Sequence, residues 1–449
     1  MAKVIRLKKG LDIRLAGAAK SVSTKLPLSA SYTLTLPPFV GLTPKAVVRE
    51  GDVVKAGDAL FVSKQQPQMK FSSPVSGVVE LVERGERRKL LGIKVKADAE
   101  QQYVDFSQKI SGNMTASQVR ELLLESGLFG YINQLPYAVV ADAESTPKGI
   151  FVSALRDMPL AGDFEVELQG QEADFQAGLT ALSKIAKTYL GVGAKQKSPA
   201  LVSAKDVEVT VFSGKCPAGN VGVQVNHISP VNKGEVVWTV DPTAVIFIGR
   251  LMNTGKVNLT RTVAVAGSEV KETGYVDVLV GTPVSDILAG RIDNAEGKRI
   301  IDGNPLTGAK TTLDGYLGAH SSEVCVLPEG AHADEMLGWI MPRFNQYSSS
   351  RSYFSWLCGK KEYKLDTRIK GGERHMIMSG EYDKVLPMDI YGEYLIKAII
   401  SGDIDRQEAL GIYEVSPEDF AVAEFVDSSK LELQKIVRQG LDILRKENA

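Results

Sequence analysis

The chain has 449 residues, a length at which about three domains are expected, and 44% of the residues are hydrophobic and 24% charged, as in ordinary globular proteins. The formal net charge of −1 provides no basic excess for binding the phosphates of nucleic acids. No run approaches the roughly 18 consecutive apolar residues of a membrane-spanning helix, and the first residues lack the apolar core of a signal peptide, so any membrane association is predicted to be peripheral.

The first region, residues 1–105, has the pattern of short strands. Valine-rich runs are interrupted by Gly-Asp turns at Gly51 and Gly57. Further along, Leu91, Ile93 and Val95 alternate on one face, which is typical of a half-buried strand.

Within this region, the stretch QPQMKFSSPVSGVVELVERG (66–85) raises the question of a prosthetic group. Biotinyl and lipoyl carrier domains also place a lysine before such a strand, but they keep it further from the proline, at the tip of a hairpin. Here only three residues separate Lys70 from Pro74, and Lys64, nearer the tip, lacks the expected neighbours. We therefore predict an unmodified Lys70 within a strand of a barrel-sandwich hybrid domain, with a biotin or lipoyl carrier as the less favoured alternative.

Residues 106–257 alternate helix and strand, which predicts a Rossmann-like α/β domain with a parallel sheet. Thr115 and Gln118 can form a capping box for a helix that ends at Gly127. Asp174 can cap the next helix. The apolar positions of that helix recur at helical spacing: Phe175, Leu179, Leu182, Ile185 and Tyr189. Residues 149–155 and 207–212 are predicted strands, with a loop over 191–206.

Short strands return over residues 258–316, and residues 317–384 are predicted to be a β-rich connecting segment. For the aromatic run of this segment, core packing is favoured over a docking surface; its members are Trp339, Phe344, Tyr353, Phe354 and Trp356.

Residues 385–449 are predicted to form a helical domain. Ser416, followed by Pro417, can begin one helix, and Ser429 with Glu432 can form a capping box for the last. The apolar face of that last helix is predicted from Leu433, Ile436, Val437 and Leu444.

Cysteine and histidine are few and dispersed. The three cysteines, Cys216, Cys325 and Cys358, form no C-x-x-C pair, which argues against a disulfide framework and against the four thiolates of an iron–sulfur cluster. The four histidines form no H-x-x-x-H pair, and each is expected at the surface or at the edge of the core: His227, His320, His332 and His375. The sequence indicates no metal site and no catalytic residue, and it leaves any cofactor-binding residues unassigned.

Four stretches carry a resemblance to a known family: KKGLDIRLAG (8–17), the run from Lys70 to Val95, PAGNVGVQVNHISPVN (217–232) and EYDKVLPMDI (381–390). Together with the order of the domains, they resemble the A subunit of the Na+-translocating NADH:quinone reductases over nearly the whole chain. More distantly, the chain is similar to the large subunit of the Rnf complex and the flavin subunit of complex I. The resemblance implies a multi-domain α/β (α+β) fold, with a β-grasp domain of the SLBB type at 258–316 and a degenerate iron–sulfur domain at 385–449.

The chain departs from its flavin-binding relatives at the residues that would hold cofactors. Their glycine-rich loop approaches the phosphate of FMN, whereas SGLFGYINQLPY (126–137) keeps only Gly127 and Gly130, and side chains from Tyr131 to Gln134 would obstruct the phosphate. The helical region has no cysteine for a cluster. Flavin binding in the usual mode and a cluster are therefore not expected on this chain.

One departure from the A subunits themselves lies in the stretch PAGNVGVQVNH. Some members carry a T-H-x-H pattern where this chain has Gln224 and Asn226, so a role for those histidines does not transfer. The glycines of PAGNVG are interpreted as serving a turn and close packing, with a phosphate or quinone loop as the less favoured alternative.

The resemblance implies a peripheral subunit on the cytoplasmic face of the bacterial inner membrane. Its complex would couple NADH oxidation and quinone reduction to Na+ export, with FAD, FMN, riboflavin and iron–sulfur on other subunits. The integral membrane subunits are the expected partners, and this chain is expected to bind quinone or to serve assembly. The alternative is an electron-entry subunit of the Rnf type that carries FMN and iron–sulfur itself.

Overall fold

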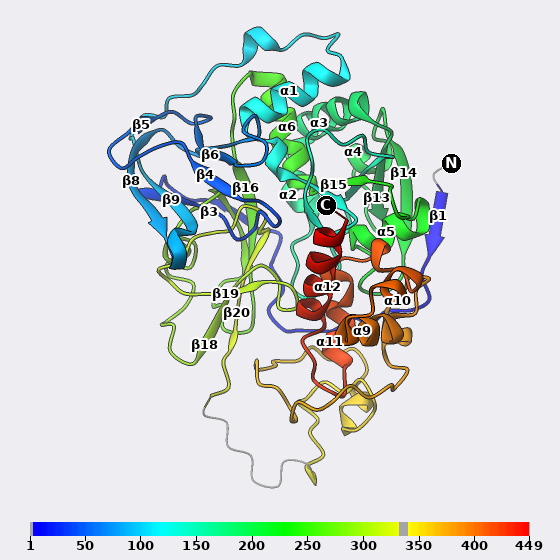
Figure 1. Ribbon diagram of the computed structural model, residues 1–449. Helices are drawn as coiled ribbons and strands as arrows, with labels where there is room; N and C mark the ends of the chain where they lie inside the picture. The colour runs from blue at the N-terminus through cyan, green and yellow to red at the C-terminus, as the bar shows by residue number, and fades with distance from the viewer. Residues whose placement is uncertain (1–2, 332–339, 449) are drawn as a thin grey trace.

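The computed structural model describes residues 3–331 and 340–448, which form four sheets and a helical region (Figure 1). The N-terminal barrel lies beside α1 (Ala116–Ser126) and above a six-stranded sheet, and the helical region lies below the seven-stranded α/β sheet. His332 and Trp339 lie outside the described residues.

The barrel consists of two small antiparallel sheets. One has the order β3 (Ser31–Thr35), β9 (Leu90–Ala97), β8 (Gly77–Arg84) and β5 (Val53–Val54), and the other β4 (Pro44–Ala46), β6 (Ala59–Ser63) and β7 (Lys70–Ser72). Gly51 and Gly57 have φ of 91° and 98°, as the predicted turns require. Lys70 pairs with Val62 inside the sheet, which confirms the predicted strand position.

Two strands of the first hundred residues belong to other sheets. β1 (Lys3–Arg6) pairs with β14 (Glu208–Ser213) of the α/β sheet, and β2 (Ser23–Lys25) pairs with β17 (Gly274–Leu279) of the six-stranded sheet. The N-terminal segment therefore ties three regions together, which local periodicity does not reveal. The bounds proposed for the five regions stay predictions.

The α/β sheet has the order β1-β14-β13-β12-β15-β10-β11. Its remaining strands are β13 (Thr188–Gly193), β12 (Ile150–Ser153), β15 (Val237–Val240), β10 (Ile132–Leu135) and β11 (Val139–Val140). The strands from β1 to β15 are parallel, and β10 runs antiparallel to β15. Helices cover both faces, as predicted for a Rossmann-like domain.

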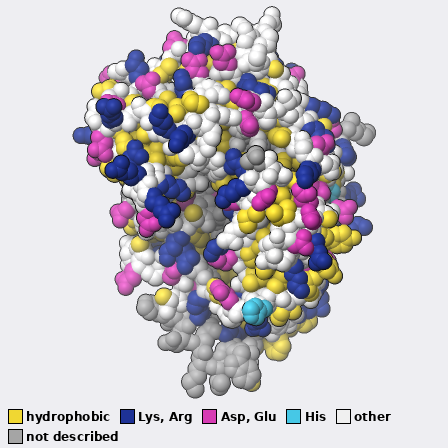
Figure 2. Space-filling model, viewed as in Figure 1, with side chains coloured by type: hydrophobic (Ala, Val, Ile, Leu, Met, Phe, Trp, Pro, Cys, Tyr) yellow, Lys and Arg dark blue, Asp and Glu magenta, His cyan; other side chains and the backbone are white. Residues whose placement is uncertain are grey.

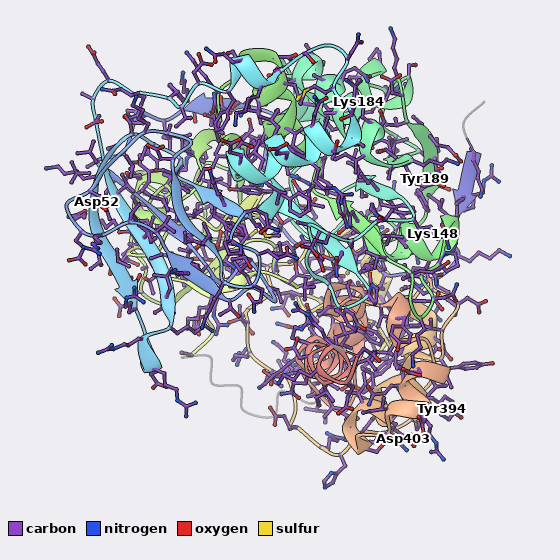
Figure 3. All side chains as sticks on the ribbon, turned by 45° about the horizontal axis from the view of Figure 1, so that its top comes forward. Asp52, Lys148, Lys184, Tyr189, Tyr394 and Asp403 are labelled. Atoms are coloured by element: carbon purple, nitrogen blue, oxygen red, sulfur yellow. The ribbon has the colours of Figure 1, made fainter. Side chains whose placement is uncertain are left out.

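The core on one face of this sheet is formed with α3 (Glu172–Ile185) and α6 (Pro242–Thr254), and the core on the other face with α5 (Val221–Ile228). The shorter helices are α2 (Phe164–Leu168) and α4 (Pro199–Val202). In Figure 3, Lys148, Lys184 and Tyr189 lie in this part of the molecule, far from Asp52 of the barrel.

The helix predictions hold in part. Thr115 and Gln118 form the capping box of α1, and Gly127 ends it in the left-handed conformation. The prediction for Asp174 is wrong, because α3 begins two residues earlier. Tyr189 is also not helical: it belongs to β13, which extends into the predicted loop as far as Gly193. No glycine or proline separates α3 from β13. The apolar residues of β13 therefore continue the helical spacing beyond the actual end of α3.

The six-stranded sheet has the order β19 (Ala309–Thr311), β18 (Lys298–Asp302), β20 (Glu323–Pro328), β16 (Thr260–Ala266), β17 and β2, with α7 (Val284–Ile287) packed on it. β20 lies in the segment predicted to connect domains, yet it is a central strand here. In the described part of 340–384 the structure has a 3-10 helix at Phe354–Cys358 and the start of α8 (Tyr382–Val385).

The helical region contains α9 (Gly392–Ser401), α10 (Ile404–Ala409), α11 (Ala421–Val426) and α12 (Leu433–Glu447), with 3-10 turns at Ile412–Glu414 and Pro417–Phe420. Ser416 caps the second 3-10 turn, with Pro417 at its first position, as predicted. The predicted cap of α12 is wrong: Ser429 is buried and its hydroxyl accepts from the N–H of Ile377. The apolar face of α12 packs into a core of aliphatic and aromatic side chains.

Candidate functional site

The carboxyl edge of the α/β sheet is where a ligand of this fold would bind. From β12 the chain moves outward to β13 and β14 and then returns to β15 on the other side of β12. The order of the strands therefore reverses between β12 and β15. Open parallel sheets bind ligands in the crevice at such a point.

Side chains of the chain itself fill this crevice. Arg156 follows β12, and its guanidinium donates to the carboxylate of Glu167 on α2, to Asp241 Oδ1 at 3.3 Å and to Thr243 Oγ1 at 3.0 Å. It also lies over the ring of Phe164, 5.5 Å from the centroid. Asp241 follows β15 directly and caps α6. We call Arg156, Glu167 and Asp241 the crevice cluster.

The crevice cluster is a buried ion pair with a third, partly exposed member. Glu167 is 2% exposed, Arg156 11% and Asp241 33%. Burial alone would lower the pKa of Arg156, but the carboxylates of Glu167 and Asp241 outweigh it and raise that pKa. Burial likewise acts to raise the pKa of Asp241, and Arg156 and Arg261 overcome it, so the pKa of Asp241 is lowered. The guanidinium of Arg156 is thus neutralised by carboxylates of the same chain.

The six-stranded sheet closes the crevice from outside. A Cβ added at Gly162, in the loop after β12, would lie 3.1 Å from the Cβ of Ala264 on β16 and 2.9 Å from Glu167 Oε1. The backbone of the loop therefore packs directly between the two sheets. A flavin or nucleotide phosphate would have to displace Arg156 to bind here, so the residues present do not fit such a group.

The N-terminus of α5, at PAGNVG, is filled in the same way. A helix N-terminus attracts anions, and here the buried carboxylate of Asp419 lies against it: a Cβ at Gly222 would be 2.4 Å from Asp419 Oδ2. Asn220 Nδ2 donates to Glu418 O at 3.1 Å. Burial raises the pKa of Asp419. The motif joins the α/β sheet to the helical region, which agrees with the interpretation as a turn and close packing.

The segment 126–137 packs on the strand that carries Lys70. A Cβ at Gly130 would lie 2.2 Å from Phe71 Cε1, one at Gly127 would lie 2.2 Å from Ser72 Oγ, and that hydroxyl donates to Ser126 O at 2.6 Å. Tyr131 is buried and does not stand over the loop. β7 therefore packs against both glycines of this segment, and the predicted obstruction of a phosphate by side chains from Tyr131 to Gln134 stays a prediction.

The described histidines lie apart from one another. His227 lies on α5 with Nδ1 2.9 Å from Val223 O, and His375 is exposed. His320 is half-buried at the edge of the core, as predicted, with its ring edge-on to Phe39 and to Tyr131, both at 5.4 Å between centroids. Burial lowers the pKa of His320 to about 4.

The two positions of the missing T-H-x-H pattern have structural contacts. Gln224 Nε2 donates to Ser153 Oγ at 2.8 Å, and Asn226 Nδ2 donates to Glu414 Oε2 at 2.6 Å. The first contact fixes α5 to β12, and the second fixes it to the helical region.

The three cysteines are not paired with one another: Cys216 and Cys325 are buried and Cys358 is half-buried. Among residues 3–331 and 340–448, no group of three or more His, Cys, Asp and Glu side chains is placed to hold a metal ion. Over the same residues, no helix has both the length and the apolar character needed to cross a membrane.

Sequence reasoning missed the crevice cluster. Arg156 and Glu167 lie 11 residues apart, but Asp241 lies 85 residues from Arg156, and the sheet topology brings it to them. A local signal was the position of Arg156 and Asp241, each shortly after a buried strand.

Family models match three parts of the chain. They are described as the NqrA N-terminal barrel-sandwich hybrid domain at residues 5–98, the NqrA second alpha/beta domain at 114–257 and the NQRA C-terminal domain, an SLBB model, at 262–312. They agree with the predicted barrel-sandwich hybrid, α/β and SLBB-type domains.

Curated relatives match along nearly the full length. The A subunit of the Na(+)-translocating NADH-quinone reductase of Pasteurella multocida is 36% identical over 450 residues, covering 99% of this chain and 100% of that protein. The A subunits of Neisseria meningitidis serogroup A and Haemophilus influenzae are each 34% identical at the same coverage.

A solved NAD+-reducing [NiFe]-hydrogenase in the air-oxidized state has 12% identity over 47% of both chains, with a TM-score of 0.35. This similarity is too low to support a conclusion about fold or function. The curated relatives and the family models, by contrast, agree over the whole chain. The chain therefore belongs to the NqrA family, the A subunits of the Na(+)-translocating NADH-quinone reductases.

Proposed function

We propose that this chain is the peripheral, cytoplasmic-side subunit of a sodium-pumping NADH:quinone reductase of the bacterial inner membrane. The observation that carries this proposal is the full-length similarity to the NqrA proteins, at 36% identity. In such a complex, NADH oxidation and quinone reduction drive Na+ export. This chain contributes by docking on the membrane subunits, and the redox groups, namely FAD, FMN, riboflavin and iron–sulfur, are carried by the other subunits.

The filled sites support a role without a bound redox group. Arg156 occupies the crevice of the α/β sheet, Asp419 occupies the N-terminus of α5, and β7 covers Gly127 and Gly130. In each place a cofactor phosphate would compete with side chains that are already packed there. Quinone contacts are left without assigned residues, because an apolar groove with few polar contacts has no distinctive pattern.

An exposed apolar and aromatic surface supports a role in docking. Phe344, Phe354 and Trp356 are 48%, 55% and 48% exposed, so the core packing that the sequence favoured for them is wrong. Figure 2 shows further hydrophobic side chains gathered over the helical region. Exposed large apolar side chains of this kind are typical of a protein or membrane interaction site.

Exposed aromatic side chains also lie on α9 and on its N-terminal flank. Tyr391 and Tyr394 are exposed, and their rings lie 6.4 Å apart. In Figure 3, Tyr394 and Asp403 lie on the outer side of the helical region, away from the α/β sheet. Tyrosine suits a contact that is apolar on one side and wet on the other.

The charge of residues 340–378 supports the cytoplasmic side. This segment has eight Lys and Arg against three Asp and Glu, a net charge of +5, in a chain whose net charge is −1. The cytoplasmic leaflet is anionic and attracts basic segments. A peripheral protein that docks through a basic, aromatic segment is therefore suited to that face.

Purification from the native membrane tests the proposal. A chain tagged at one end, extracted with mild detergent, is expected to carry integral membrane, flavin-containing subunits with it in fixed ratio. Recovery of the chain alone, under conditions in which those subunits stay bound to one another, would count against the proposal.

The two alternative functions are tested by the flavin and iron contents of the purified chain and by its mass. An Rnf-type electron-entry protein would carry flavin and iron, so absorbance near 450 nm and iron analysis of the purified chain should find less than about one tenth of an equivalent of either. A biotin or lipoyl carrier would exceed the mass of the unmodified sequence. The pairing of Lys70 within β7 favours an unmodified lysine.

A further inference from the structure

A cavity of about 320 Å³ lies between the six-stranded sheet, the N-terminal segment near Ile13, the segment 365–368 and α11 of the helical region at Phe425. Its volume is at the lower end of the range for small-molecule sites. It is separate from the crevice cluster, and neither the function proposed above nor the family match assigns it a ligand.

The inner wall of the cavity is apolar. Ile13, Ile301 and Leu327 are buried side chains of this wall, and Leu306 and Phe425 are half-buried beside them. Ile301 and Leu327 come from the adjacent strands β18 and β20, so the floor is part of a rigid sheet. Such a wall takes up an apolar group and excludes water from it.

The mouth of the cavity is cationic. Arg299, Lys310 and Arg368 line it, and among the described residues Asp366 is the one acidic side chain in the lining. Because Arg299 and Lys310 come from the paired strands β18 and β19, their charges lie side by side at the opening.

One carboxylate is shared by the two cations of the sheet. Glu329 accepts from Arg299 Nε at 2.6 Å and from Nη2 at 2.5 Å, and it also lies 3.3 Å from Lys310 Nζ. The hydrogen bond from Arg299 lowers the pKa of Glu329 to about 2, so this carboxylate is ionised at neutral pH. Arg299, Lys310 and Glu329 together therefore keep one positive charge at the mouth.

The opposite side of the mouth does not add a free negative charge. Asp366 Oδ2 lies 2.8 Å from Arg368 Nη2 and 3.7 Å from Lys370 Nζ. The carboxylate of Asp366 is thus already bound to cations of its own segment and does not oppose an anion beside Arg299 and Lys310.

We infer that this cavity binds an amphipathic organic anion, with the apolar body of the ligand against Ile301 and Leu327 and a single phosphate or carboxylate group beside Arg299 and Lys310. An uncharged ligand would leave the positive charge at the mouth uncompensated, and an inorganic anion would leave the apolar wall unfilled. The site needs both parts of the molecule.

The test is calorimetric titration of the full chain with octyl phosphate and with octanoate. Saturable binding of one equivalent of each is expected. The neutral 1-octanol should bind about tenfold more weakly, because it lacks the charge-assisted hydrogen bonds, and inorganic phosphate alone should give no saturable heat. A neutral short-chain ubiquinone should also fail to compete.

Two charge variants and one matched control locate the site. Arg299→Gln should weaken octyl phosphate binding about tenfold, and Lys310→Gln, on an exposed side chain that does not endanger folding, about threefold. Lys25→Gln removes the same charge from β2, at the opposite edge of the same sheet, and should change nothing.

Equal affinity for octanol and octyl phosphate, or octyl phosphate binding unchanged in both Arg299→Gln and Lys310→Gln, would overturn the inference. Sedimentation with lipid vesicles distinguishes whether the bound anion belongs to a membrane lipid or to a free amphiphile. Sedimentation with phosphatidylglycerol but not phosphatidylcholine vesicles, lost in both variants, assigns the anion to a membrane lipid; octyl phosphate binding without sedimentation assigns it to a free amphiphile. Either result supports the site and neither depends on assembly of the reductase.

Discussion

Replacing Arg156 by Met removes the cation that fills the crevice of the α/β sheet. The variant keeps a side chain of similar length but leaves the carboxylate of Glu167, 2% exposed, without its ion-pair partner. It also removes the hydrogen bond to Thr243 and the contact with the ring of Phe164.

Breaking a buried ion pair by removing one partner costs about 3–5 kcal/mol. The lower end applies here. Burial raises the pKa of Glu167, and Arg156 opposes that rise, so in the variant this carboxyl takes up a proton and leaves no bare buried charge. Asp241 is one-third exposed and is hydrated when Arg156 is gone. We therefore expect the free energy of unfolding of this domain to fall by about 3 kcal/mol.

Urea unfolding, followed by the fluorescence of the fully buried Trp238 on β15, measures this loss within the α/β domain. The double variant Arg156→Met/Glu167→Gln removes both charges of the buried pair and should recover part of the stability. Arg84→Met, on an exposed position of β8, is the control and should stay within about 0.5 kcal/mol of the unchanged chain.

A loss below about 1 kcal/mol in the Arg156→Met variant would refute the reasoning. Refutation would be complete if the unchanged chain bound FMN and the variant lost that binding without losing stability. Arg156 would then serve a ligand and not the fold.

Three further predictions test other parts of the account. His320 has a folded pKa of about 4 against about 6.5 in the unfolded chain, so the unfolded state takes up the proton first and stability should fall by about 3 kcal/mol as the pH drops from 6.5 to 4; this slope should be missing in His320→Gln, and an equal slope in both proteins would contradict it. Gly130→Ala, which places a Cβ against Phe71, should cost about 1–3 kcal/mol in urea unfolding, whereas Gly112→Ala, with nothing within 4 Å, should cost nothing. Phe354→Ser with Trp356→Ser should release the chain from its membrane partners in pull-down assays while leaving its melting temperature unchanged, since both side chains are about half exposed; Val53→Ser, on an exposed position of the barrel, is the control that should still pull them down.

The sequence predicted correctly those features that depend on residues close together along the chain. The capping box of Thr115 and Gln118, the left-handed Gly127 and the strand position of Lys70 each depend on a few neighbouring residues, and the structure confirms them. The predicted end of α3 is wrong because apolar residues of β13 continue the helical spacing. Only the pairing of β13 with β12 and β14 decides between helix and strand for these residues.

The candidate site is formed by residues that come together only in the folded chain. Arg156, Glu167 and Asp241 meet because the strand order reverses between β12 and β15, which no window of the sequence contains. His320 is half-buried because Phe39 of the barrel and Tyr131 of the α/β domain, which are distant in the sequence, both pack against its ring. The loss of glycines could be read from the sequence, but the close approach of Gly130 to Phe71 could not.

The central claim is the proposal that this chain serves the reductase by docking, with the crevice of the α/β sheet and the segment 126–137 filled by the protein's own residues. The most direct measurement is reconstitution: membranes lacking this chain are assayed for Na+-dependent NADH:quinone reductase activity before and after addition of the purified chain, whose flavin and iron contents have been measured. The account predicts that a chain without flavin or iron restores the activity. Stoichiometric flavin or iron in the chain, or activity that returns only after FMN or iron is supplied to the chain, would contradict it.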